Sequence, residues 1–288
     1  MSSQEALALR RSILVPRLFS RLPGRRFVLI VAASIAVLAL VMAIFAPLLA
    51  PDSPNVTDFA NTLAPPGGEH LLGTDNVGRD ILSRLIYGAR LSLLGPLVVV
   101  LLSTAIGVPM GLAAGYLGGW VDGILARSWD VLLAFPSLLL AIVVVAAFGA
   151  GFLTATIAIA VVYTPLVARV VRGLVLAERS RTYVEAMRTL GFGKMRIASR
   201  HILPNIGNGI LAQATLNFGY ALLDLAGLSF IGLGVQPPDA DWGTMLAQGR
   251  ADILLAPTEA LVPAAAIILV AISFNLLGDA VSDRLQRR

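Results

Sequence analysis

Residues 27–50 read FVLIVAASIAVLALVMAIFAPLLA and contain no charged side chain. A helix needs about 20 consecutive apolar residues to cross the hydrocarbon core of a bilayer. The apolar region of a cleaved signal peptide is only about 7–15 residues long. Residues 27–50 therefore predict a retained first transmembrane helix, preceded by an arginine-rich N-terminal segment at 1–26.

The chain as a whole has the composition of a membrane protein. Of its 288 residues, 57% are hydrophobic and 14% are charged, whereas a soluble domain has roughly 45–50% apolar and about 25% charged residues. We expect five further spans, at about 91–117, 131–148, 152–177, 206–235 and 261–281. The predicted fold class is an all-α polytopic membrane protein with six transmembrane helices.

The basic residues predict the orientation of these spans, because cytoplasmic loops carry an excess of Lys and Arg. With the N-terminus inside, 18 of the 22 basic residues lie on the cytoplasmic side, and only Arg79, Arg84, Arg90 and Arg250 lie outside. Both termini are therefore predicted to be cytoplasmic. Residues 1–26 then form a cytoplasmic segment, and residues 178–205 form a long cytoplasmic loop.

The outer side is predicted to hold a loop at 51–90, followed by a core of five spans at 91–288. The last part of this loop has an apolar helical face, formed by Ile81, Leu82, Leu85 and Ile86. Asp80 and Arg84 stand four residues apart, a spacing that allows an ion pair on a helix. These features predict a separate amphipathic helix at the membrane interface.

Several classes of site are excluded by residues that are absent or isolated. There is no cysteine, and the two histidines, His70 and His201, are far apart in the sequence. Lys194, the only lysine, is followed by Met195, whereas a Walker A loop requires Lys followed by Ser or Thr. We therefore expect no metal, cofactor or catalytic residue in this chain. An intramembrane hydrolase is disfavoured by the lack of a GxSxG sequence.

The cytoplasmic loop contains the segment TYVEAMRTLG, residues 182–191. Thr182 and Glu185 have the spacing of a capping box, which predicts that Thr182 caps a short helix. Gly191 predicts the end of that helix, and Pro204 separates it from the next span. An apolar stripe at helical spacing is formed by Tyr183, Met187 and Leu190. The residues alone leave open whether this stripe contacts the ends of the spans or another protein.

This segment resembles the EAA loop of ABC-importer permeases, in which EAA is followed by three residues, Gly, nine residues and I-x-L-P. The matching positions are Glu185, Ala186, Gly191, Leu203 and Pro204. Met187 replaces the third residue of EAA, and His201 replaces the Ile.

Motifs elsewhere resemble the C-type permease subunit of dipeptide and oligopeptide importers. They are HLLGTDNVGRDILSRLIYGAR at 70–90, DVLLAFPS at 130–137, LSFIGLG at 228–234, PP at 237–238 with WG at 242–243, and NLLGD at 275–279. The resemblance implies a type I ABC-importer permease fold in a prokaryotic inner (plasma) membrane. It also implies import of di- or oligopeptides, with nickel or glutathione as alternative substrates.

The resemblance further implies partners and the residues that meet them. The expected partners are a B-type permease subunit, two ABC ATPase subunits that bind ATP and Mg²⁺, an extracytoplasmic peptide-binding protein and the lipid bilayer, with no nucleic acid. The chain itself is expected to be a non-enzymatic subunit. ATPase coupling is assigned to Tyr183, Glu185, Ala186, Met187, Leu190, Gly191 and Pro204. Contact with the binding protein is assigned to Asp75, Arg79, Asp80 and Trp242.

Two features inside the spans complete the predictions. Asp224 is an acid deep in an apolar segment, which makes it a candidate for the translocation pathway, although holding a bend or pairing with an Asn or a backbone group explains it equally well. Small residues recur every four positions at Gly107, Gly111, Gly115 and Gly119. They predict close helix packing, and we favour packing within this chain over packing against a second subunit.

A self-sufficient secondary transporter is the alternative of a different class. Such a protein needs an ion-coupling site with several buried polar groups. Asp224 is a single such group, so it supports this alternative only weakly.

Overall fold

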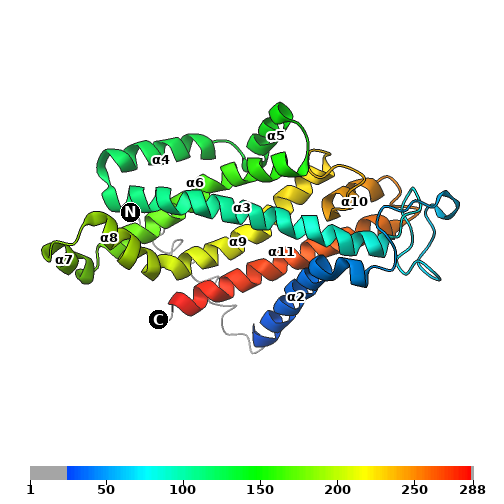
Figure 1. Ribbon diagram of the computed structural model, residues 1–288, viewed down its shortest axis with the longest axis horizontal. Coiled ribbons are helices and arrows are strands. Elements are labelled where there is room, and N and C mark those ends of the chain that lie inside the picture. The colour runs from blue at the N-terminus through cyan, green and yellow to red at the C-terminus, as the bar shows by residue number, and fades with distance from the viewer. Residues whose placement is uncertain (1–24, 287–288) are drawn as a thin grey trace, which may run out of the picture.

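The computed structural model describes residues 25–286, so the predicted N-terminal segment at 1–26 lies outside the described residues except for its last two positions. Within this range the chain forms helices and no β-strand beyond two isolated bridges. Four long helices run side by side along the longest dimension of the molecule (Figure 1): α3 (Ile81–Leu117), α6 (Phe152–Arg179), α9 (Leu203–Phe230) and α11 (Pro257–Gln286).

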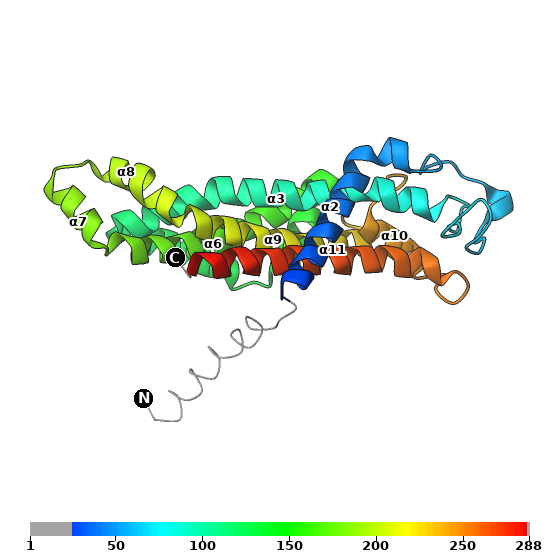
Figure 2. The same cartoon turned by 90° about the horizontal axis from the view of Figure 1, so that it is seen from below.

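Helix α2 (Arg25–Leu49) packs against α3 and α11 and crosses them at an angle (Figure 2). Its buried apolar residues, Ala32, Ala39 and Ala46, recur every seven positions. Because alanine is small, these positions let the backbone of α2 approach its neighbours closely. The helix is kinked at Phe45, whose backbone is not helical (φ −98°, ψ 19°), two residues before Pro47.

The connections gather at the two ends of this bundle (Figures 1 and 2). One end carries α7 (Thr182–Thr189), α8 (Lys194–Ile197) and the π-helical turn η2 (Ala198–Ile202). The other end carries the segment at 51–80, which includes η1 (Phe59–Asn61), together with α10 (Trp242–Gly249). The loops predicted on opposite sides of the membrane therefore lie at opposite ends of the molecule.

Among the residues that the structure describes, four helices are long and apolar enough to cross a membrane: α2, α3, α6 and α11. Helices α4 (Gly119–Leu133) and α5 (Ser137–Phe148) together make a fifth candidate, bent by 84° at the break between them. Helix α9 has 28 residues, which is enough to span a bilayer. Its apolar sequence, however, is interrupted by polar residues such as Asn217 and Asp224. The predicted number of six spans stays a prediction.

The structure revises the third predicted span, at 131–148. That range begins inside α4 and crosses the break before α5, where Pro136 has an extended backbone (φ −54°, ψ 129°). Proline cannot donate the backbone hydrogen bond that a continuous helix requires. Since α5 has 12 residues and rises about 18 Å, it is too short to cross the bilayer by itself.

The separate interfacial helix predicted before residue 91 is also revised. Residues 81–90 and the predicted second span form one continuous helix, α3, of 37 residues. The apolar face predicted for the membrane interface faces protein instead, since Ile81 lies in the same buried cluster as Trp242 and Met245 of α10. Gly88 lets α10 approach closely, because a Cβ at this position would stand 3.2 Å from the Trp242 ring.

Candidate functional site

Helix α7 packs onto the end of the bundle through one face. Val184 is fully buried, and Tyr183 and Met187 are half-buried in the same apolar cluster. The cluster also takes residues from α6, α8, η2 and α9: Val175, Ile197, Ile202 and Ile206. The inner face of α7 is therefore covered by the ends of the chain's own helices.

The other face of α7 is exposed and carries Glu185, Ala186 and Leu190. The predicted stripe is thus divided, since Tyr183 and Met187 face the bundle whereas Leu190 is 75% exposed. Leu190 is the C-cap residue, with a non-helical backbone (φ −75°, ψ 3°). Its side chain therefore leaves the face on which the stripe begins and is exposed at the C-terminal end of α7.

The two ends of α7 differ in how well the sequence predicts them. Gly191 follows the helix with φ +79°, a conformation that glycine adopts without strain, and the amide of Phe192 donates to the Met187 carbonyl at 3.1 Å. The predicted capping box does not form. The N-cap is Arg181, which has the extended backbone (φ −77°, ψ 146°) and no side-chain cap bond, so Thr182 already lies inside the helix.

A buried carboxylate lies directly behind α7. Oε1 of Glu178, at the end of α6, accepts hydrogen bonds from the Tyr183 hydroxyl and from Nδ2 of Asn205, both at 3.0 Å. Asn205 also donates to the Tyr183 oxygen at 3.1 Å. Burial of the phenol, and its bond to Glu178, raise the pKa of Tyr183. The hydroxyl therefore stays protonated and remains a donor. Asn205 follows Pro204, which is exposed in the first turn of α9.

Asp224 pairs with a neighbouring helix deeper in the bundle. It lies on α9, and its Oδ2 accepts a hydrogen bond from the Tyr163 hydroxyl of α6 at 3.0 Å. The partner of Asp224 is thus a tyrosine hydroxyl, and not the Asn or backbone group that the sequence suggests. A role in the translocation pathway stays a prediction.

The glycine stripe lies between α3 and α6. A Cβ added at Gly107, Gly111 or Gly115 would stand 2.4–2.9 Å from the nearest α6 atom. The three glycines therefore allow a backbone approach within this chain that no larger residue permits. Gly119 does not share this role, because it lies beyond the end of α3 with φ +57°, and a Cβ at this position would have no neighbour within 4 Å. It turns the chain into α4 instead.

The residues assigned to binding-protein contact are buried, which corrects that assignment. Asp75, Arg79, Asp80 and Trp242 have exposed fractions of 0–7%. Oδ2 of Asp75 accepts from Nε of Arg79 at 2.6 Å and lies 3.6 Å from Nε of Arg84, while both arginines donate to Gln248 of α10. This network joins the outer segment to α10. A charge removed from water needs such partners, so these side chains turn inward and leave the surface.

Asp80 is the N-cap of α3 and does not pair with Arg84 as predicted. Its Oδ2 accepts from the amide and the hydroxyl of Ser83, both at 2.7 Å, and its Oδ1 lies 3.1 Å from Nδ1 of His70. The ligand atoms of Asp52, His70 and Asp80 lie within 4.8 Å of one another, a spacing that suits a metal ion. Because both Asp80 oxygens are already engaged, we assign this cluster to helix capping.

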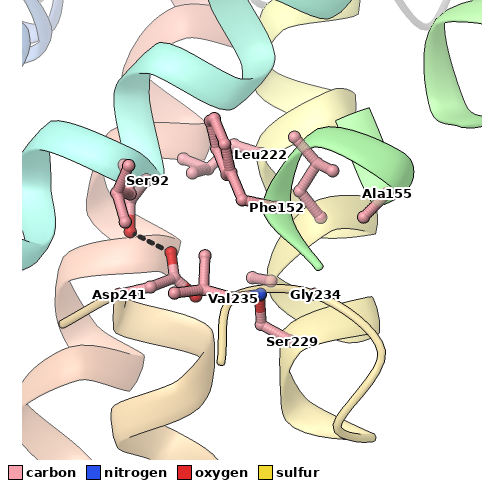
Figure 3. A pocket seen from close by; sticks show the side chains of 11 residues that line it. Ser92, Phe152, Ala155, Leu222, Ser229, Gly234, Val235 and Asp241 are labelled. Carbon is pink, nitrogen blue, oxygen red and sulfur yellow. Dashed lines mark hydrogen bonds between the residues drawn. The ribbon is translucent and has the colours of Figure 1, made fainter. Parts of the chain in front are cut away.

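A small pocket beside α10 is lined by Ser92 of α3, Phe152 of α6 and Asp241 (Figure 3). The Ser92 hydroxyl donates to Oδ1 of Asp241 at 2.6 Å, as Figure 3 shows. Oδ2 of Asp241 caps α10 by accepting from the amides of Gly243 and Thr244. The polar groups at this pocket therefore satisfy one another and position α10.

A comparison with known protein families identifies the family of this chain. The profile of the binding-protein-dependent transport system inner membrane component family matches residues 107–288. The chain belongs to this family. Such proteins are the membrane component of ABC importers, so this chain is an ABC-importer permease subunit that works with ATPase and binding-protein partners.

Relatives of this permease span most of its length. The dipeptide transport system permease protein of Alkalihalophilus pseudofirmus is 45% identical over 85% of this chain and 81% of the relative. The glutathione transport system permease protein of Escherichia coli is 44% identical over 91% of this chain and 86% of the relative. The corresponding protein of Pectobacterium atrosepticum is 41% identical over 91% and 87%.

Solved structures agree on the fold of the permease. An inward-facing structure of the MetNI methionine ABC transporter aligns with a TM-score of 0.53 at 19% identity, covering 68% of this chain and 95% of that chain. A second crystal form of the same transporter gives a TM-score of 0.54. The protein thus has the type I importer fold that its motifs imply.

Sequence reasoning missed three residues of the permease: Glu178 and Asn205, which lie behind α7, and Val184 on the inner face of α7. Glu178 and Asn205 stand outside the EAA pattern, and Val184 stands between two members of the predicted stripe. A polar residue just past each flanking span was the available signal for Glu178 and Asn205. Their pairing depends on how α6 and α9 meet, and that is decided by packing across the bundle.

Proposed function

We propose that this permease forms half of the translocation pathway of an ATP-driven importer of short peptides, di- or oligopeptides and glutathione included. We further propose that it couples to its ATPase subunits through residues 178–205. The observation that carries this proposal is α7, whose inner face packs on α6 and α9 while Glu185, Ala186 and Leu190 are exposed. An isolated helix of eight residues is unstable in water, so packing must hold its exposed face in position.

The names of the relatives support short peptides as the substrate class. One relative is a dipeptide permease and another is a glutathione permease, and glutathione is itself a tripeptide. A substrate defined by peptide groups and terminal charges is common to both. The same family also supports, as part of the proposal, a B-type permease as heterodimer partner and an extracytoplasmic peptide-binding protein.

The lone Lys194, followed by Met195, supports the placement of ATP hydrolysis in partner chains. A P-loop needs Ser or Thr after its lysine, so ATP and Mg²⁺ are assigned to the ATPase subunits. The proposed orientation, with both termini in the cytoplasm of a prokaryotic cell, places α7 on the side where those subunits and ATP are found.

Reconstitution into proteoliposomes tests this function. The permease is combined with the B-type permease, ATPase and binding-protein chains of its own organism, and uptake of a radiolabelled dipeptide and of radiolabelled glutathione is followed with and without ATP. We expect uptake that requires ATP and co-purification of the ATPase chains. Uptake by this chain without ATPase subunits would overturn the proposal in favour of a secondary transporter.

Two exposed leucines at opposite ends of the molecule provide a matched pair of variants. Leu190 lies at the tip of α7, and Leu254, which is 95% exposed, lies in the connection between α10 and α11. We expect Leu190→Ser and Glu185→Arg to reduce ATPase co-purification or ATP-driven uptake at least about fivefold. Leu254→Ser should leave ATPase co-purification unchanged. Equal behaviour of the two leucine variants would contradict the assignment of α7.

A further inference from the structure

The cluster of Glu178, Tyr183 and Asn205 joins three helices at one oxygen atom. Glu178 belongs to the last turn of α6, Tyr183 to the first turn of α7, and Asn205 to the first turn of α9. Three hydrogen bonds of 3.0–3.1 Å connect each of the three side chains to the other two. Glu178 is only 6% exposed, so this cluster is shielded from water on the side that faces the bundle.

The chain itself provides α7 with unequal connections to the two long helices. Only residues 180–181 separate α7 from α6, whereas residues 190–202, with the short helix α8 and the π-helical η2, separate it from α9. A displacement of α7 would therefore reach α6 directly and α9 only through a long connection. Among residues 25–286, a single hydrogen bond, from Nδ2 of Asn205 to the Tyr183 hydroxyl, joins α7 directly to the first turn of α9.

We infer that Glu178 is a positioning residue for coupling, through which a displacement of α7 moves α6 and α9 together. This inference rests on the proposed function of α7 as the contact with the ATPase. Helices α6 and α9 are the pair that Tyr163 and Asp224 also connect deeper in the bundle, at 3.0 Å. Because the two helices are joined by hydrogen bonds at both places, α6 and α9 move together when the last turn of α6 or the first turn of α9 is displaced.

The chemistry of the cluster suits this role. A carboxylate has two oxygens that each accept more than one hydrogen bond, so Glu178 alone can hold donors from two helices. Its other oxygen, Oε2, forms an ion pair with Arg181, whose Nε lies 3.0 Å away, and this compensates the buried charge. Hydrogen bonds to an ionised acceptor are shorter and stronger than neutral ones. Val184 and Ile206, neighbours in the chain of Tyr183 and Asn205, are buried in one apolar cluster, whereas Asn205 itself is exposed on its outer side.

Tyr183→Phe is the sharpest test, because it removes only the hydroxyl and keeps the ring that packs beside Val184. The complete importer is reconstituted as above, and substrate transported per ATP hydrolysed is measured with the radiolabelled dipeptide or glutathione. We expect Tyr183→Phe and Asn205→Ala each to lower this ratio about fivefold, with the ATPase chains still co-purifying. Ser180→Ala is the matched control, since its hydroxyl bonds only to the Ala177 carbonyl of its own turn.

The outcomes separate this inference from the proposed function. An unchanged ratio in both variants, in an assembled importer that transports substrate, would overturn the inference and leave the proposed function intact. Loss of the ATPase chains from the Tyr183→Phe complex would also overturn it, because the hydroxyl would then serve assembly. Failure of the wild-type permease to bind ATPase chains at all would overturn the proposed function first.

Discussion

Nε of Arg90 on α3 donates to the backbone carbonyl of Ala43 on α2 at 2.9 Å. This carbonyl lies four residues before Pro47, which has no amide hydrogen to offer it. The arginine thus supplies the hydrogen bond that the proline removes, at the point where Phe45 leaves helical geometry. The kink of α2 and its attachment to α3 therefore have a single cause.

Removing this donor should loosen α2. We expect Arg90→Leu to lower the free energy of unfolding by about 0.5–1.5 kcal/mol, the net contribution of a typical hydrogen bond, because this bond is exposed. Thermal unfolding in detergent measures the change. Arg90→Lys, which keeps a charged donor, should lose less. If the two variants unfold at the same temperature, the hydrogen bond does not hold α2.

Enlarging the glycine stripe should force α3 away from α6. A Cβ at Gly111 would stand 2.4 Å from the Ala168 carbonyl oxygen and 2.7 Å from Cβ of Val171. We expect Gly111→Ala to destabilise the permease by about 1–3 kcal/mol, the usual cost of overpacking. Gly123→Ala is the control, since nothing lies within 4 Å of that position. Thermal midpoints that fall equally in both variants would disprove the close contact.

Neutralising Asp75 should affect folding before it affects recognition. Arg79 and Arg84 are buried with Asp75 as their carboxylate partner, and breaking a buried pair costs about 3–5 kcal/mol. We expect Asp75→Asn to reduce the yield of folded permease sharply. The exposed Glu69 of the same segment is the comparison, and Glu69→Gln should fold normally. If Asp75→Asn folds normally but no longer associates with the extracytoplasmic binding protein, then Asp75 contacts that protein as predicted from the sequence.

Capping of α10 can be tested at Asp241. Asp241→Ala removes the acceptor for the amides of Gly243 and Thr244 and the acceptor to which the Ser92 hydroxyl donates. Loss of an N-cap costs about 0.5–2 kcal/mol. Asn caps helices about as well as Asp, so we expect Asp241→Asn to be milder than Asp241→Ala. The ranking is read from thermal unfolding, and the reverse order would argue against capping as the role of Asp241.

Local chemistry explains which features were predictable from sequence. Gly191 ends α7 because only its own backbone conformation is involved, and the apolar runs at 27–50 and 152–177 form α2 and α6 because each run satisfies its own backbone hydrogen bonds. Pro136 marks a break in the sequence, yet the apolar run at 131–148 predicts a single span. The 84° turn between α4 and α5 depends on what each helix packs against.

Features that join distant parts of the chain were not predictable in the same way. Asp75, Arg79 and Trp242 look like surface residues of loops, but they are buried because α10 folds back onto the outer end of α3. The capping box of Thr182 and Glu185 had correct spacing, yet the turn after α6 places the extended residue at Arg181. One residue of register decides which side chain can reach the helix end.

The sequence by itself determined the membrane class, the approximate spans, the family and the end of α7, because each depends on composition or on neighbours within a few residues. Tertiary structure alone decided that Leu190 is exposed while Val184 is buried, and that Glu178, Tyr183 and Asn205 meet at one oxygen. Those positions lie far apart in the chain or on opposite faces of one short helix. Only the packing of α6, α7 and α9 against one another brings their atoms within hydrogen-bonding distance.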